Sequence, residues 1–384
     1  MKRFDVIVVG ASPAGLRAAW ASAKAGGSTL LVESRPSVDA RPPPATVAFD
    51  HLWTAEARPD PKAVRARRAG VTICSPAGHA LAIEAPLSVL DRARFDGQLL
   101  AEAERAGSEV AFGVEGLEVL PDRTLSAPDL EARGRVLVFA DGARTLARRF
   151  FEPVRDPGAL VWGVALEFPC EAPLDRPVLT FGEHAPGGRS QLDAIDGVAF
   201  HWTFARGDAE RARALAPRAL GRDLALSDLP LDLARAARET AVAADPVFTV
   251  PRRLVSDGVV VAGGAGGQGG LEAGLAAGER AGRVAGEAAR SGRTDARSLG
   301  KYERTWMREH QAGYRALRLA SRRLSSLDDA GWDRLLAPWR GRSLAVDDFA
   351  GLADASAWRR LRAVLALAAL NPRALPPLAR AAFA

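Results

Sequence analysis

The stretch VIVVGASPAG, residues 6–15, spaces its small residues in a way that suits phosphate binding. In the pattern G-x-G-x-x-G after a strand, the first glycine turns the chain, the second admits a pyrophosphate and the third lets helix and strand pack closely. Gly10 and Gly15 take the first and third positions. Ser12 takes the second and adds only a hydroxymethyl group, whose oxygen can itself donate to a phosphate. We therefore predict a pyrophosphate-binding turn at the N-terminus of a helix, made by Gly10, Ala11, Ser12, Pro13, Ala14 and Gly15.

The acidic residue that accompanies such a turn is also present. Glu33 ends a second apolar strand, predicted at residues 28–33, and lies 18 residues after Gly15. A carboxylate at that place accepts hydrogen bonds from the ribose hydroxyls of an adenosine. Ser34 follows it, and Arg35 is expected to cover the adenine. The alternative is a glycine-permitted tight turn beside an empty site, which Ser12 leaves open.

Three later segments resemble the parts with which flavoproteins of the glutathione-reductase type close an FAD site. VLDRARFDGQLLAEAERAG places Arg92 at a helix start, where such folds hold an arginine near the flavin or the pyrophosphate. VLVFADGAR places Asp141 and Gly142 at a strand end. VVVAGGAGGQGG resembles the last segment, from which a helix directs its positive N-terminus at the flavin pyrimidine. The cofactor-binding glycines expected in this last segment are Gly264, Gly269 and Gly270.

Gly264 is a departure, because the resembling segment usually carries an aspartate there that binds the ribityl chain. One missing charge-assisted hydrogen bond is worth about 1.5–3 kcal/mol. FAD would then bind about ten- to a hundredfold more weakly unless another group replaces the carboxylate. Gln268, or water bound to the loop amides, is the expected replacement.

Together these segments resemble the geranylgeranyl reductase family of FAD-dependent oxidoreductases, which includes the digeranylgeranylglycerophospholipid reductases, over nearly the whole chain. The family motif Y-x-W-x-F-P corresponds to FHWTFA at residues 200–205, where the Tyr and the Pro are replaced. Alternate residues of a strand share one face. An aromatic wall for a prenyl chain would therefore consist of Phe200, Trp202 and Phe204. The alternative is an ordinary stripe of a sheet core. His201 would point to the opposite face and is expected to be structural.

The resemblance implies reduction of isolated C=C bonds in a geranylgeranyl-type prenyl chain of a lipid. Reduced FAD would deliver a hydride from N5 to one alkene carbon, and a proton would add to the other. The external electron donor would be ferredoxin or NAD(P)H. No residue is assigned as catalytic, and the five scattered histidines show no metal-ligand spacing. The family's cysteine-containing stretch after the ribose-binding Glu is replaced here by ARPPPATVAFDHLW.

Two other functions remain open at this point. A flavin-dependent monooxygenase shares the fold; a halogenase would in addition need a lysine beside its substrate. Four lysines are present, at positions 2, 24, 62 and 301, and Lys62 lies in a proline-containing charged loop, which disfavours halogenation. A member of the family that binds prenyl lipid without chemistry would account for Ser12, Gly264 and the missing cysteine stretch.

Positive charge is concentrated in the C-terminal tail. Residues 296–384 hold 16 of the 52 Lys and Arg residues and 8 of the 46 Asp and Glu residues, together with four of the eight tryptophans. This composition suits a peripheral contact with the anionic inner face of a membrane, where prenyl lipids partition. The alternative is a solvated helical face in an arginine-rich chain. Because the aromatic and basic residues lie on helices with packing stripes, no nucleic-acid partner is expected.

Cysteine content and hydropathy bear on the compartment. The two cysteines, Cys74 and Cys170, indicate no disulfide framework and favour the reducing cytoplasm. No apolar run reaches the ~20 residues that cross a bilayer, and no secretory leader is expected before the first strand.

The order of these elements predicts an α/β fold with a glutathione-reductase-type FAD-binding Rossmann domain. We expect that domain to comprise residues 1–155 and 251–295, with an inserted α+β substrate domain containing an antiparallel sheet at 156–250 and a helical C-terminal region at 296–384. Within it, helices are predicted at 13–25 and 92–106, a hairpin around SPAGH at 75–79, and a loop across the proline-rich residues 35–50.

Overall fold

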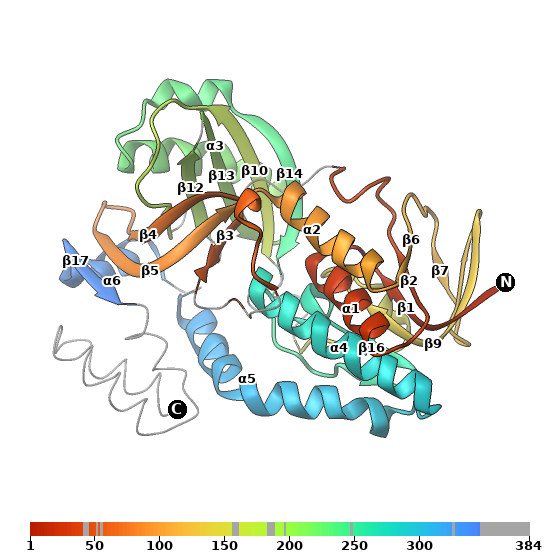
Figure 1. The fold of residues 1–384 in the computed structure, drawn as a ribbon. Coiled ribbons are helices and arrows are strands. Elements are labelled where there is room, and N and C mark those ends of the chain that lie inside the picture. The colour runs from red at the N-terminus through yellow and green to blue at the C-terminus, as the bar shows by residue number, and fades with distance from the viewer. Residues whose placement is uncertain are drawn as a thin grey trace.

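The computed structural model describes residues 1–40, 46–50, 53, 57–155, 161–182, 189–195, 197–245, 249–324 and 327–345. Two β-sheets organise these residues, and helices cover them (Figure 1). Short 3-10 helices complete the connections: η3 (Pro61–Ala63), η4 (Leu146–Arg149), η6 (Leu231–Ala236), η7 (Gly263–Gly266) and η8 (Ala337–Trp339).

The first sheet has the strand order β15-β16-β9-β1-β2-β6. Its strands are β1 (Lys2–Val9), β2 (Thr29–Val32), β6 (Glu109–Ala111), β9 (Leu130–Phe139), β15 (Val255–Ser256) and β16 (Val259–Val261). β16, β9, β1, β2 and β6 run parallel, β15 is antiparallel to β16, and β7 (Glu118–Val119) and β8 (Thr124–Ala127) extend the sheet beside β9. The predicted strand–helix–strand unit is thereby confirmed, with α1 (Pro13–Lys24) joining β1 to β2.

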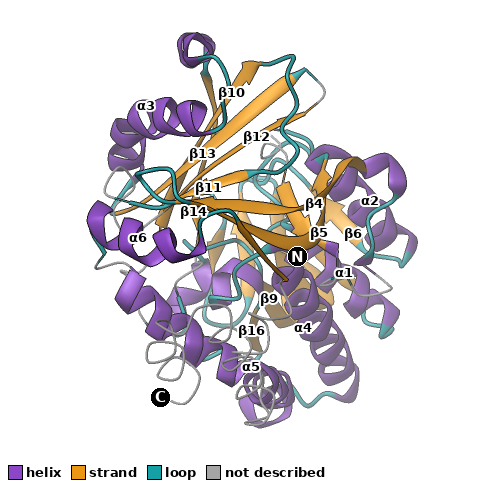
Figure 2. Cartoon of the chain, turned by 90° about the vertical axis from the view of Figure 1, so that its left-hand side faces the viewer, coloured by secondary structure: helices purple, strands orange, loops and turns teal. Residues whose placement is uncertain are grey.

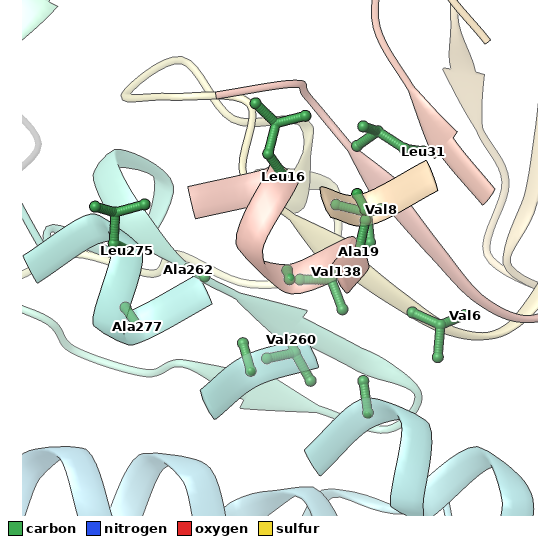
Figure 3. Close-up of a cluster of buried hydrophobic side chains, with 14 of the residues drawn as sticks. Val6, Val8, Leu16, Ala19, Leu31, Val138, Val260, Ala262, Leu275 and Ala277 are labelled. Carbon is green, nitrogen blue, oxygen red and sulfur yellow. The ribbon is translucent and has the colours of Figure 1, made fainter. Parts of the chain in front are cut away.

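Helices α1 and α4 (Leu271–Ser291) lie against each other on this sheet (Figure 1). The contact is close enough that a Cβ added at Gly278 would lie 2.0 Å from the carbonyl oxygen of Ala14, and one at Gly282 equally close to that of Ala18. Apolar side chains of the sheet and of both helices fill the space beneath them (Figure 3). The small-residue composition of both helices therefore follows from the depth of their packing.

A buried arginine ties three helices together. Arg17 of α1 is 1% exposed, and it forms ion pairs with Glu102 of α2 (Arg92–Arg105) and Glu279 of α4. Its guanidinium also lies over the ring of Trp20 at 3.9 Å. Because removing one partner would leave an uncompensated buried charge, this network fixes the mutual placement of α1, α2 and α4.

The second sheet has the order β14-β10-β13-β12-β11-β4-β5-β17, with β3 beside β5. Its strands are β3 (Thr46–Phe49), β4 (Val64–Cys74), β5 (Ala80–Leu90), β10 (Val161–Pro169), β11 (Val178–Thr180), β12 (Arg189–Ile195), β13 (Val198–Arg206), β14 (Arg238–Asp245) and β17 (Arg342–Ala345). Helix α3 (Ala209–Leu226) covers one face of β10, β12 and β13 (Figure 2). The sheet is mostly antiparallel, but β11 pairs with β4, and β17 with β5, in parallel.

Three regions of the chain contribute strands to this second sheet. Strands within residues 46–90, which are expected in the FAD-binding domain, pair with each other and then with β11. Residues 161–245 contribute β10 to β14, and residues 342–345 add β17 at the edge beside β5. The expected domain limits stay a prediction, because sheet pairing alone does not define where one folding unit ends.

The expectation of a loop throughout residues 35–50 is wrong for its last part. Thr46–Phe49 forms β3 and pairs antiparallel with Leu87–Leu90 of β5. The run TVAF is β-branched and aromatic, which suits a half-buried strand, and the prolines before it dominated the sequence-based interpretation. The predicted hairpin around residues 75–79 is confirmed by the antiparallel pairing of β4 with β5.

The C-terminal part begins with the long helix α5 (Ala296–Leu324), which runs beneath α4, and continues with α6 (Asp329–Leu336) (Figure 1). Leu299, Tyr302 and Trp306 of α5 are buried on its inner face. Among the described residues, no helix is long and apolar enough to cross a membrane. The apolar run at 363–370 lies outside the described residues.

Candidate functional site

The turn between β1 and α1 is built by close backbone approach. Gly10 has φ +98°, and a Cβ there would lie 2.8 Å from the carbonyl oxygen of Ala140. A Cβ on Gly15 would lie 1.8 Å from the carbonyl oxygen of Gly10. Both positions therefore admit only glycine, and the backbone of the turn lies directly over the carboxyl end of β9.

Ser12 caps helix α1. Its Oγ accepts a hydrogen bond from the Gly15 amide at 3.3 Å and donates one to the Ala140 carbonyl at 2.8 Å. The hydroxyl proton is therefore committed to the protein, and the expectation that it donates to a phosphate does not describe this structure. What Ser12 does instead is to join the start of α1 to the end of β9.

Glu33 is held in place at the carboxyl end of β2. One of its carboxylate oxygens accepts from the Ala11 amide at 2.7 Å, and the other accepts from the Arg35 amide at 3.0 Å and from Ser34 Oγ at 3.2 Å. The Arg35 guanidinium reaches both Glu33, at 3.2 Å, and the Ala11 carbonyl, at 3.1 Å. Burial by itself raises the pKa of Glu33, but the hydrogen bonds and charge of Arg35 outweigh it and lower the pKa below 4.5. Glu33 is thus an ionised acceptor.

Asp141 and Gly142 face Glu33 from the end of β9. Oδ2 of Asp141 accepts from the Leu146 amide at 2.7 Å, whereas its buried Oδ1 has no hydrogen-bond partner. Burial raises the pKa of Asp141, against the opposing hydrogen bonds from Thr145 and Leu146. Gly142 has φ +82° with open space around its Cα. A buried carboxylate oxygen without a partner is costly, and this one belongs to a residue that lines a cavity.

These groups meet around a cavity of about 500 Å³. Seven of the predicted cofactor residues line it: Gly10, Ser12, Glu33, Ser34, Arg35, Asp141 and Gly142. Its other lining residues are Val9, Val32, Val114, Gly116, Leu117, Ala140 and Leu146. The volume falls in the range of small-molecule sites, and its mixture of a few polar groups with apolar walls suits a nucleoside.

The loop that contributes Val114, Gly116 and Leu117 was not predicted as part of the site. It follows β6 and is fixed by the amide of Val114, which donates to the Glu33 carbonyl at 3.0 Å. Gly113 and Gly116, both with positive φ, were the signal in the sequence that the chain turns here.

The remaining predicted cofactor residues lie elsewhere. Ala11, Pro13, Ala14 and Gly15 form the turn and first helical residues behind the cavity. Arg92 begins α2, and its guanidinium binds Asp96 at 2.9 and 3.1 Å and Thr46 Oγ1 at 3.2 Å. Since it does not line the cavity, its contact with a flavin stays a prediction.

The glycine loop, residues 263–270, links β16 to α4. Gly264 lies in η7, and Gly270 caps α4 with φ +90°. The loop does not line the cavity. Gln268 is buried at 1% exposure and binds the Gly263 amide and the Tyr302 hydroxyl, so it does not replace the aspartate that Gly264 lacks. At the start of α4, the Glu272 carboxylate accepts from the Phe49 amide at 2.8 Å and links α4 to β3.

The aromatic wall lies on one face of β13. Trp202 and Phe204 stack with ring centroids 5.3 Å apart, and Gly163 of β10 makes room for the Phe204 ring. Phe200, at 1% exposure, packs into a core cluster with Leu336 and Trp339. Phe200 and Phe204 are therefore buried in this structure, and of the three predicted wall residues Trp202 is the one that is partly exposed.

His201 lies on the opposite face, as predicted. It is fully buried beneath α3, where its Nε2 is 2.9 Å from Oδ2 of Asp223. Thr203 Oγ1 lies 3.4 Å from its Nδ1. The prediction of a structural histidine is confirmed.

Comparison with known proteins gives the context of this arrangement. No family model matches the chain. The digeranylgeranylglycerophospholipid reductase 1 of Methanothermobacter thermautotrophicus is 28% identical over 329 residues, which cover 78% of this chain and 81% of the relative. The digeranylgeranylglycerophospholipid reductase of Methanocaldococcus jannaschii is 26% identical over 343 residues, which cover 80% and 83%.

Solved structures show the same fold. A geranylgeranyl bacteriochlorophyll reductase-like protein from Thermoplasma acidophilum has a TM-score of 0.78 at 19% identity, with 99% of this chain and 100% of the other covered. A point mutant of the halogenase PltM, solved in complex with FAD, has a TM-score of 0.63 at 13% identity, with 96% and 84% covered. The fold is thus the one that these proteins share, a Rossmann-type parallel sheet combined with a second, mostly antiparallel sheet. Sequence and fold comparisons agree: over most of its length the chain is similar to digeranylgeranylglycerophospholipid reductases and to a geranylgeranyl reductase-like structure.

Proposed function

We propose that the protein is an FAD-dependent reductase of C=C bonds in a geranylgeranyl-type prenyl chain. The observation that carries this proposal is the cavity of about 500 Å³ between the β1–α1 turn, Glu33 and Asp141. It combines an ionised acceptor, an unpaired buried carboxylate oxygen and a helix N-terminus within one space. Dinucleotide-binding folds use an acidic acceptor for the ribose and a helix N-terminus for the pyrophosphate.

The residues present fit the adenosine and pyrophosphate parts of FAD. Glu33 offers acceptors to the ribose hydroxyls, and Oδ1 of Asp141 accepts a further hydroxyl hydrogen. The N-terminus of α1 stabilises the pyrophosphate through its amides and its dipole. Val114 and Leu117 supply an apolar wall for the adenine, and Arg35 closes it on the polar side.

When bound, FAD supplies the hydride that a C=C bond needs for reduction. The protein's part is to orient and to exclude water. The glycine loop and the positive N-terminus of α4 would receive the pyrimidine side of the flavin, where negative charge is best stabilised. Trp202 and Phe204 would hold the apolar chain against it. His201 is bound to Asp223 on the far face and does not deliver the proton.

The proposed reaction also implies a substrate, an electron donor and a location in the cell. The substrate is a prenyl lipid, and the electrons come from ferredoxin or NAD(P)H. Cys74 and Cys170 are both free and buried, in keeping with a reducing cytoplasm. The basic tail, residues 296–384, would hold the enzyme at the inner membrane surface where its substrate resides.

The first test is the visible absorption spectrum of the purified protein with and without added FAD. A stoichiometric flavin band is expected, and its abolition by Glu33→Arg would place the adenosine in the cavity. A protein that stays colourless and ignores FAD would contradict the proposal.

The second test is anaerobic turnover of a geranylgeranyl lipid with chemically reduced enzyme, followed by mass spectrometry. The expected product gains two hydrogen atoms for each bond reduced. A product that forms only with O₂ would show a monooxygenase instead. Binding of the lipid without any flavin would show a non-catalytic member of the family.

A further inference from the structure

Gln268 closes the glycine loop upon itself. Its side-chain Oε1 accepts from the Gly263 amide at 2.9 Å, and its own backbone amide donates to the Gly263 carbonyl at 3.0 Å. Gln268 therefore binds both the backbone amide and the backbone carbonyl of Gly263, the first residue of the loop. The side chain also packs beside Gly266, where an added Cβ would lie 3.2 Å from Oε1.

Tyr302 of α5 anchors this closure from outside the loop. Its hydroxyl accepts from Nε2 of Gln268 at 2.8 Å and donates to the carbonyl of Val261, the last residue of β16, at 3.1 Å. Gln268 and Tyr302 are 1% and 2% exposed. Hydrogen bonds in such a dry environment are strong when every member is paired. The network thus fixes the end of β16, the loop and α5 as one unit.

The loop needs such an anchor because of its composition. Six of the eight residues at 263–270 are glycine. Glycine loses more conformational freedom on ordering than any other residue. A loop of this kind would be a poor receptor if it were ordered only when a ligand bound, because the ordering would weaken binding.

We propose that Gln268 and Tyr302 are positioning residues that hold the glycine loop in its FAD-receiving conformation before FAD binds. This inference rests on the proposed function. It also explains how the family's aspartate can be absent at Gly264. Affinity lost with that carboxylate is offset by a loop that is already ordered, because preorganisation removes the entropic cost from the binding step.

The test compares three variants of the full-length protein: Gln268→Leu, Tyr302→Phe and Tyr314→Phe. Tyr314 is the matched control, since it lies on the same helix and its hydroxyl is hydrogen-bonded to Trp306 Nε1 at 2.8 Å, which is not part of the Gln268–Tyr302 network. Two measurements are made on each. One is hydrogen–deuterium exchange of the peptide spanning residues 262–270 in the FAD-free protein. The other is the dissociation constant of FAD by flavin fluorescence.

We expect Gln268→Leu and Tyr302→Phe to speed exchange of the loop peptide and to weaken FAD binding about tenfold, the effect of one lost buried hydrogen bond. The double variant should be little weaker than either single one, because both remove the same network. Tyr314→Phe should change neither quantity, even if it lowers Tm as much as Tyr302→Phe does.

Unchanged exchange of the loop peptide in Gln268→Leu would overturn the proposal, as would an equal loss of FAD affinity in Tyr314→Phe. If the wild-type protein binds no FAD at all, the proposed function fails. The exchange data on the FAD-free protein then decide by themselves whether these two residues order the loop.

Discussion

At the scale of single residues, Ser12 shows how a departure from a motif can be absorbed. The second glycine of the fingerprint normally clears space for a pyrophosphate. Ser12 has extended backbone angles that any residue adopts, φ −70° and ψ 164°, and directs its hydroxyl toward Ala140. The side chain therefore contributes a helix cap and a link to β9. The effect of the Ser12 side chain on cofactor affinity depends on the space that it leaves for a pyrophosphate, and a binding titration measures this effect.

Replacing Ser12 separates these two contributions. We expect Ser12→Ala to lower the free energy of unfolding by about 1 kcal/mol, since it removes the cap of α1. Ser12→Gly should cost only a few tenths of a kcal/mol by the same comparison, and should leave FAD affinity equal to or tighter than that of the wild type. Urea denaturation and a fluorescence titration measure the two effects. Weaker FAD binding by Ser12→Gly would show that the hydroxyl assists the cofactor directly.

Asp193 makes stability depend on pH. It is fully buried on β12, and burial raises its pKa from 3.8 to about 6, although Arg68 lies 3.8 Å away and opposes the shift. The folded protein therefore holds this proton more tightly than the unfolded chain. The group's contribution is fully present below pH 3.8 and is lost as pH rises to about 6.

The variant Asp193→Asn should accordingly flatten the fall in unfolding free energy between pH 4 and about 6, where the wild-type carboxyl titrates. Because Asp141 also has a raised pKa, the unfolding free energy of the variant still falls with pH. The contribution of Asp193 is the difference between the slopes of the wild type and the variant. It is obtained from urea unfolding at several pH values. Identical slopes would show that Asp193 ionises normally.

At the scale of elements, the crossing of α1 and α4 depends on glycine spacing. Gly274, Gly278 and Gly282 share one face of α4, but their surroundings differ. An added Cβ at Gly278 would lie 2.0 Å from a backbone oxygen, whereas one at Gly274 would lie 3.8 Å from the Cβ of Ala14. At Gly278, as at Gly282, the steric conflict is with the backbone and cannot be relieved by a side-chain movement, whereas Gly274 has no such conflict.

This difference gives a paired prediction. Gly278→Ala should destabilise the protein by about 1–3 kcal/mol, because the helices must separate. Gly274→Ala should be neutral or stabilising by up to about 1 kcal/mol, because alanine favours the helix and meets no clash. Both values come from denaturant unfolding of the purified variants. Equal effects at the two positions would mean that the helices are less closely packed than described.

The elements also show what sequence can and cannot provide. The β1–α1–β2 unit and Glu33 were predictable, because their signals are local and lie within about 30 residues. β3 was missed, because its pairing with β5 is a long-range contact that outweighs the prolines before it. The role of Gln268 was assigned wrongly for the same reason: its partner Tyr302 is 34 residues away. Predictions therefore failed where a distant segment decides the outcome.

At the scale of the whole molecule, the two sheets are tied together by segments far apart in sequence. Strands β3 to β5 and β17 belong to the second sheet. Val154, which precedes β10, forms an antiparallel β-bridge with Pro251, which follows β14. Glu272 connects α4 to the backbone of β3, and Glu303 connects α5 to that of Leu254. The glycine loop thus lies where the first sheet, the second sheet and α5 meet. A displacement of α5 would therefore move the glycine loop, because Tyr302 of α5 is hydrogen-bonded to Gln268.

The uneven charge of the molecule yields the last prediction. The tail, residues 296–384, carries an excess of basic residues on a chain whose remainder is slightly acidic. Each well-placed Arg or Lys adds about 1 kcal/mol of attraction to an anionic surface, and salt screens this attraction. The full-length protein should therefore co-sediment with vesicles containing anionic phospholipid and not with purely zwitterionic ones, and should be released as ionic strength rises from about 0.1 to 1 M. Binding that is independent of anionic lipid would mean that the basic residues are only a solvated face. The proposed prenyl substrate would then have to reach the protein without electrostatic docking at the membrane.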